Sequence, residues 1–329
     1  MSAPIHLLNP NDSALAEESL TRLLFEEASA RAHFVRLGST LSAITSRHAE
    51  LAPCLLSLLG EMSAATTLLS GALKFEGSVL LQLHGDGPVR LVVTECSDSL
   101  GLRGTLTLDS TQTSPDPQST LTQLVNAHGQ GRLSLVLDTK APGQRPYQGI
   151  VAFEGEALAG AIESYMSQSE QLPTRLWLAS DGQVAGGLLL QQMPQVGGTA
   201  RGASDPARRE DAWNRLCLLA DTVAPSELMH TPPGLLLHQL FWEESARVLD
   251  TRHPRFECPC SRARVGRMLA GLGQDEVESI LQERGEVETR CDFCNTLYRF
   301  DAIDCARLFT EGDSSLLDSA SQPGSTTTH

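Results

Sequence analysis

Four cysteines near the C-terminal end of the chain constrain its folding more than any other feature. Cys258 and Cys260 form a C-x-C pair, and Cys291 and Cys294 form a C-x2-C pair thirty residues later. Zinc binds four thiolates at about 2.3 Å in structural sites, which have no open position for a substrate. The two pairs therefore predict one closed zinc site with four cysteine ligands. Because a single residue separates Cys258 from Cys260, these two sulfurs can also reach each other on oxidation.

The spacing alone leaves two interpretations of this site open. An inert site would only stabilise a small domain, whereas a redox-active site would exchange its metal for disulfides. The surrounding segment predicts helices that begin at Ser261 and Asp301, another helix that ends at Gly285, and strands over 287–290 and 297–300. Its apolar residues are few, so metal binding would supply a large part of the folding free energy, on the order of 10 kcal/mol. We therefore expect zinc removal to unfold this segment.

Arginines crowd the cysteine motif in a chain that is otherwise acidic. Cations and zinc both favour the thiolate, which is the form that peroxide attacks. The same arginines also fit a solvated helix face, and the sequence does not choose between the two. They are Arg255, Arg262, Arg264, Arg267, Arg290 and Arg299.

Length and charge limit the class of protein. A chain of 329 residues fits one large domain and one small one. The net charge of −15 argues against nucleic-acid binding by the whole chain. No stretch approaches the roughly 18 unbroken apolar residues of a membrane span, and the first ten residues lack signal-peptide features. We expect a cytoplasmic protein that does not bind membranes. Its remaining cysteines are expected to be small core residues: Cys54, Cys96, Cys217 and Cys305.

The first 195 residues predict a large α+β domain with a mixed sheet around a central helix. Apolar residues at three- and four-residue spacing predict this helix over residues 53–73, and a further helix is expected over 156–168. The Gly-Asp-Gly turn at 85–87 opens a strand and is not followed by Gly-Lys-Ser/Thr, which excludes a phosphate-binding loop. Strands are predicted over 28–37, 78–83, 89–95, 104–108, 132–138, 149–154, 174–179 and 184–192.

Residues 196–245 predict a helical linker region. Ser204 is a candidate N-cap ahead of Pro206, and a second helix is expected to begin at Thr231. These helices are either ordinary core helices or an apolar surface that becomes exposed and binds other proteins. The candidate surface consists of Trp213, Leu216, Leu219, Leu236, Leu240, Phe241 and Trp242. Residues 246–311 are predicted to form the zinc-binding domain, and 312–329 a disordered tail.

The sequence resembles the redox-regulated 33-kDa heat-shock chaperones over nearly its whole length. The likeness begins with Cys258-x-Cys260-Ser261-Arg262 and Cys291-x-x-Cys294 at this separation. Cys305 and the Ser/Thr-rich tail after Gly312 do not belong to the family pattern. Further matching segments are residues 73–77, 82–88, 147–151, 169–174, 185–191 and 240–244.

The resemblance implies an ATP-independent holdase, which is not an enzyme. Its reduced form would hold one zinc ion on Cys258, Cys260, Cys291 and Cys294 and be inactive. Oxidation would form Cys258–Cys260 and Cys291–Cys294 disulfides and release zinc. The C-terminal region would then unfold, bind unfolding client proteins through apolar surface, and favour a homodimer.

Two other classes of protein compete with the chaperone. A zinc hydrolase needs an open metal position, and the chain has no His-Glu-x-x-His. A nucleic-acid-binding zinc module remains the alternative, and it would bind DNA or RNA through the arginines with a strong salt dependence.

Overall fold

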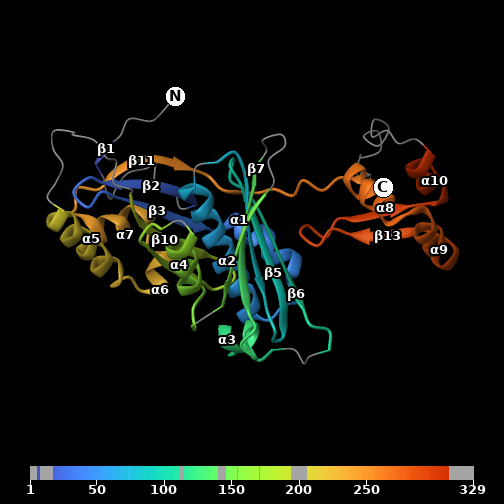
Figure 1. The fold of residues 1–329 in the computed structure, drawn as a ribbon, viewed down its shortest axis with the longest axis horizontal. Coiled ribbons are helices and arrows are strands. Elements are labelled where there is room, and N and C mark those ends of the chain that lie inside the picture. Colours follow the sequence, from blue (N-terminus) through green and yellow to red (C-terminus); the bar gives the residue numbers. More distant parts are fainter. Residues whose placement is uncertain are drawn as a thin grey trace, which may run out of the picture. The chain divides into compact units, whose positions relative to one another are not determined.

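The computed structural model describes residues 6–7, 18–73, 75–111, 115–139, 146–153, 155–169, 171–193 and 206–310 (Figure 1). The chain divides into two compact units, Met1–Glu257 and Cys258–His329. The predicted linker residues 196–205, including Ser204, and the predicted tail 312–329 lie outside the described residues.

The first unit contains two sheets of six described strands each. The first sheet has the order β1-β11-β2-β3-β10-β9, and all its described pairings are antiparallel. The second has the order β12-β6-β5-β4-β7-β8, and its β12–β6 pairing is parallel. The first sheet comprises β1 His6–Leu7, β2 Ser19–Phe25, β3 Ala30–Leu37, β9 Thr174–Ser180, β10 Ala185–Gln192 and β11 Arg247–Arg252. The second comprises β4 Gly77–His84, β5 Val89–Ser97, β6 Gly101–Leu108, β7 Arg132–Thr139, β8 Tyr147–Ala152 and β12 Arg255–Phe256.

The central helix α2, Pro53–Ala72, lies between the two sheets (Figure 1). Pro53 occupies its first turn, where a missing N–H costs nothing. A Cβ on Gly60 would lie 2.0 Å from Ser180 Oγ, so glycine is needed where α2 meets β9. By length and composition α2 would suffice to cross a membrane, but 72% of the relevant window is buried inside the protein. The predicted central helix is therefore confirmed as the core of an α+β unit.

Glu61 on α2 provides a test of this buried environment. Burial raises its pKa from 4.5 to about 7. Because the folded-state pKa lies above the ordinary value, the stability present below about pH 4.5 declines as the pH rises through 7. Glu61→Gln is expected to stabilise the protein at pH 8 by about 3 kcal/mol, at about 1.4 kcal/mol for each pH unit between the two values, and to change little at pH 4.5.

Denaturant unfolding of the full chain at both pH values measures this difference. Glu50→Gln is the control, because Glu50 is exposed. An equal effect of Glu61→Gln at both pH values would contradict the expected titration.

Three helices cover the outer face of the first sheet (Figure 1). They are α5 Pro206–Ala220, α6 Pro225–His230 and α7 Pro233–Phe241. Their apolar side chains pack against those of β2, β3 and β10 to form a second core. The first unit is therefore layered as helices, sheet, central helix and sheet. Its remaining helices are α1 Ser39–Thr45, the 3-10 helix Ser46–His48, α3 Leu121–Val125 and α4 Leu158–Ser169.

The predicted strands and helices are largely confirmed, with two differences. The predicted hairpin of β4 and β5 forms, and the strand expected over 28–37 begins at Ala30. The expected domain limit at residue 246 differs, because residues 247–252 form β11 and pair with β2 of the first unit. The next residues form β12, so the second unit begins only at Cys258.

The second unit is small and has its own core. Its elements are α8 Arg262–Leu272, α9 Gln274–Arg284, β13 Val287–Arg290, β14 Leu297–Phe300 and α10 Ala302–Thr310. Ser261 Oγ accepts a hydrogen bond from the Arg264 N–H, and Asp301 Oδ1 accepts one from the Asp304 N–H, which confirms both predicted caps. Gly285 ends α9 with a φ of 79°, as expected from a C-terminal glycine. The buried apolar residues described in this unit are Leu269, Val277, Val287, Phe300 and Cys305.

Candidate metal and redox centre

Short turns place the four cysteines of the motif. Cys258 and Cys260 lie directly before α8, and Cys291 and Cys294 lie in the turn between β13 and β14. In this turn the Cys291 N–H donates to Thr296 O at 3.1 Å, and the Asn295 N–H donates to Cys291 O at 2.8 Å. Asn295 has a φ of 59°, a left-handed conformation that asparagine tolerates well. The hairpin therefore turns both of its sulfurs toward one place.

The four sulfurs form one compact cluster. All lie within 4.8 Å of one another and could hold a metal ion. Cys258 Sγ is 3.6 Å from Cys291 Sγ, and Cys260 Sγ is 3.2 Å from Cys294 Sγ. A tetrahedral zinc site with ligands at about 2.3 Å requires sulfur–sulfur separations of about 3.8 Å. The observed separations bracket that value, and four sulfurs are the donor set that zinc prefers, so the cluster fits the ion.

Hydrogen bonds reach three of the sulfurs. The Tyr298 hydroxyl donates to Cys260 Sγ at 3.1 Å, and Cys294 Sγ lies 3.1 Å from Thr296 Oγ1. Backbone hydrogen bonds from Phe293 and Cys294 act on Cys291. Such contacts orient metal ligands and alter their basicity.

The pKa values of these thiols diverge. Burial raises the pKa of Cys260 to about 12, although the Tyr298 hydroxyl opposes this change. Burial also raises the pKa of Cys291. For Cys294, burial is outweighed by hydrogen bonds from the side chain and backbone of Thr296, which bring its pKa to about 7. Without a metal, Cys294 is thus the thiol of these three that ionises most readily at neutral pH.

The arginines near the motif divide into two groups. Arg262 has structural partners: it donates to Arg299 O at 2.6 Å, pairs with Asp304, and stacks 4.2 Å over the Phe300 ring. Arg299 forms ion pairs with glutamates of the same unit. Exposed side chains are found for Arg264, Arg267 and Arg290, as on a solvated face.

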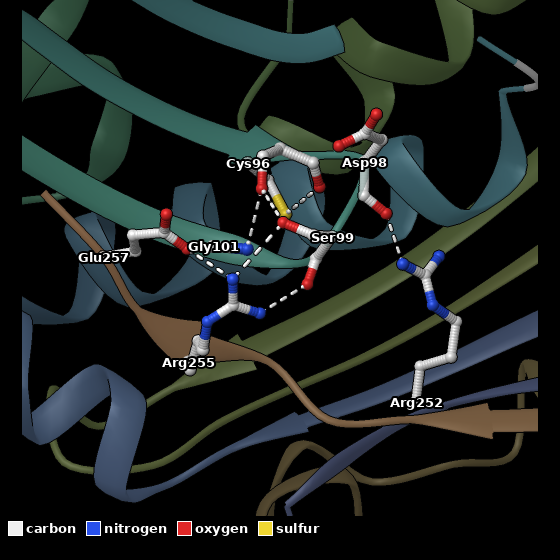
Figure 2. Close-up of polar contacts among 8 residues, drawn as sticks. Cys96, Asp98, Ser99, Gly101, Arg252, Arg255 and Glu257 are labelled. Carbon is white, nitrogen blue, oxygen red and sulfur yellow. Dashed lines mark hydrogen bonds and ion pairs between the residues drawn. The ribbon is translucent and has the colours of Figure 1, made fainter. Parts of the chain in front are cut away.

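The segment that precedes Cys258 is fixed to the first unit (Figure 2). The Arg255 N–H donates to Leu100 O, and its guanidinium donates to Ser99 O at 2.7 Å. Arg255 also pairs with Glu257 at 2.6 Å, and the Glu257 N–H donates to Leu102 O at 3.0 Å. The chain is therefore held along the edge of β6 up to the residue before the first cysteine. Arg255 thus acts in the first unit.

The candidate apolar surface is mostly covered in this conformation. Leu216, Leu236 and Phe241 are at most 1% exposed, and Leu240 is also buried in the core between the first sheet and its helices. Trp213 and Leu219 are partly buried against the same core. Trp242 is 65% exposed. Leu218, which was not among the predicted residues, is exposed beside them on α5.

The scattered cysteines lie apart from the centre. Cys96, Cys217 and Cys305 are buried, as expected of small core residues. Cys54 is partly buried at the start of α2.

Fold and site together define an α+β protein with a cysteine cluster, able to hold a metal ion, in a small separate unit. The family model described as Hsp33 protein matches residues 18–301. The chain therefore belongs to the Hsp33 family of chaperones. The 33 kDa chaperonin of Nitrosococcus oceani is 41% identical over 294 residues, which cover 89% of this chain and 95% of that protein. That of Ectopseudomonas mendocina is 41% identical over 289 residues, covering 88% and 94%.

A solved structure shows the same fold. The crystal structure of the 33 kDa chaperonin from Thermotoga maritima matches with a TM-score of 0.72 and covers 91% of this chain and all of that one. The two sequences are 20% identical, so this likeness bears on the fold alone.

Proposed function

We propose that this protein is a cytoplasmic, ATP-independent holdase that oxidation activates. In the reduced form, Cys258, Cys260, Cys291 and Cys294 would bind one zinc ion and the chaperone would be inactive. The observation that carries the proposal is the cluster of four sulfurs within 4.8 Å of one another, in a unit whose described apolar core is very small. Zinc in this cluster would supply folding free energy and keep the sulfurs deprotonated.

The activating chemistry belongs to the cysteines. A thiolate attacks a hydroperoxide, takes one oxygen as sulfenic acid and, with one proton, releases water from hydrogen peroxide. A neighbouring thiol then displaces hydroxide from this sulfur, which gives a disulfide and a second water. Two peroxide molecules per chain would convert Cys258–Cys260 and Cys291–Cys294, as in the resemblance described above. Disulfide sulfurs are poor zinc ligands, so the unit would lose its main source of folding free energy.

Unfolding clients would bind to apolar surface exposed after this change. The best candidates are the helices α5 and α7, because their buried face already carries leucine and phenylalanine side chains. Clients in partly unfolded states expose similar side chains, and the association is driven by burial of apolar area. We also propose that the oxidised form favours a homodimer and that the protein performs no catalysis.

An aggregation assay tests the proposed function. Peroxide-treated protein is expected to suppress light scattering by a heat-unfolded client, whereas dithiothreitol-treated protein is not, and ATP is expected to change neither result. Zinc content and free thiols are measured on the same samples, with an expected loss of one zinc for four thiols.

Two outcomes would count against the proposal. Equal suppression in both redox states would remove the switch. Salt-dependent binding of the reduced protein to DNA or RNA would favour a nucleic-acid-binding zinc module instead.

A further inference from the structure

Tyr298 connects the two halves of the cysteine cluster. It lies on β14, opposite Thr289 of β13, and its ring packs against the small core of the second unit. Its hydroxyl donates to Cys260 Sγ at 3.1 Å, although Cys260 lies 38 residues earlier in the chain. The contact therefore joins the β13–β14 hairpin to the C-x-C segment, which reaches the cluster from the other side of α8 and α9 in the sequence.

The second hydroxyl at the cluster has a different, local role. Thr296 lies two residues after Cys294 and contacts its sulfur within the same turn. Removing that hydroxyl would alter one sulfur without affecting how the two segments meet. Tyr298 thus combines a donor to sulfur with a long-range connection, and these two effects can be separated by experiment.

A hydroxyl donor changes the reactivity of a thiolate. In a metal-bound cluster each sulfur already carries negative charge, so the donor does not act by creating the thiolate. It withdraws electron density from the sulfur, and a less basic thiolate is a weaker nucleophile. The same hydrogen bond fixes the direction of the sulfur lone pairs, and such outer partners are typically worth 10–100-fold in metal affinity.

We propose that Tyr298 is a positioning residue that sets how easily the centre is oxidised. Its hydroxyl holds Cys260 in the orientation of a ligand and slows attack of that sulfur on the O–O bond of hydrogen peroxide. In this step Cys260 loses two electrons and gains oxygen as a sulfenic acid, and the peroxide leaves as water after taking up one proton. The inference rests on the proposed function, because it concerns the threshold of the same centre.

Tyr298→Phe tests the inference in the reduced full-length chain, because phenylalanine keeps the ring and removes only the hydroxyl. Competition with a chromophoric chelator is expected to show zinc affinity lowered about tenfold. Hydrogen peroxide is expected to release zinc several-fold faster. Alkylation and peptide mass spectrometry are expected to show Cys260 oxidised earlier relative to Cys291. With Co²⁺ in place of zinc, the sulfur-to-metal charge-transfer band is expected to move to lower energy.

Two control variants separate the hydroxyl from other effects. Tyr147→Phe removes the hydroxyl of an exposed tyrosine in the first unit and is expected to change none of these measurements. Thr296→Val is expected to advance oxidation of Cys294 and to leave Cys260 in its wild-type order.

The possible failures are distinguishable. Wild-type protein that binds no zinc would overturn the proposed function. Wild-type protein that binds zinc through four thiols, together with an unchanged Tyr298→Phe variant, would overturn the role of Tyr298 alone. Equal acceleration at all four cysteines would indicate general loosening of the unit and would also overturn it.

Discussion

Cys258→Ser is expected to lower zinc affinity by more than about a hundredfold, because even partners that only hydrogen-bond a ligand are worth 10–100-fold. Under reducing conditions the second unit is then expected to unfold. Its described core contains only five buried apolar residues, too few to fold some fifty residues without a further source of free energy. The first unit has its own cores and is expected to remain folded.

Limited proteolysis of the reduced full chain measures this effect. Fragments should show rapid cleavage between α8 and α10 and slow cleavage within the two sheets of the first unit. Cys54→Ser is the matched control, because Cys54 lies in the first unit, apart from the cluster. An unchanged digestion pattern in Cys258→Ser would show that the second unit folds without its metal ligands.

Phe241→Ala is expected to cost about 3–5 kcal/mol of stability. Phe241 is 1% exposed, and its ring meets that of Phe25 edge-on, with centroids 5.1 Å apart. Because these rings join α7 to β2, their separation should loosen the helices over the first sheet. The reduced variant is then expected to bind more of an apolar fluorescent dye than the reduced wild type, and to suppress client aggregation partly without oxidant.

The adjacent Trp242 offers a control of similar size. Its side chain is 65% exposed, so Trp242→Ala is expected to cost less than about 1 kcal/mol. Denaturant unfolding and dye binding compare the two variants directly. Similar losses at both positions, or a loosened Phe241→Ala variant with no chaperone activity, would remove the covered face of α5 and α7 as the client site.

The cysteine centre was predictable because its signals are local. Two turns of one and two intervening residues set the sulfur pairs, and Ser261, Gly285 and Asp301 mark helix ends by well-understood backbone chemistry. The hydrogen bond from Tyr298 to Cys260 could not be predicted, because nothing in the spacing brings residues 38 positions apart into contact. It needs the register of β13 with β14 and the placement of α8.

The limit between the units was missed for the same physical reason. Arg22 of β2 meets Asp250 of β11 across 228 residues of sequence, with an ion pair at 3.1 Å. No local pattern announces such a pairing. Likewise, periodicity identified the apolar faces of α5 and α7, but whether a sheet covers them depends on β2, β3 and β10.

The two-residue strand β12 has a consequence for how this protein avoids sticking to others. It lies along β6, at the end of the second sheet, and along that end no other strand is described. An open strand end carries unpaired N–H and C=O groups that attract foreign strands. Arg255 and Phe256 thus shield part of a latent template, and loss of this short ribbon would leave β6 ready to zip onto another polypeptide.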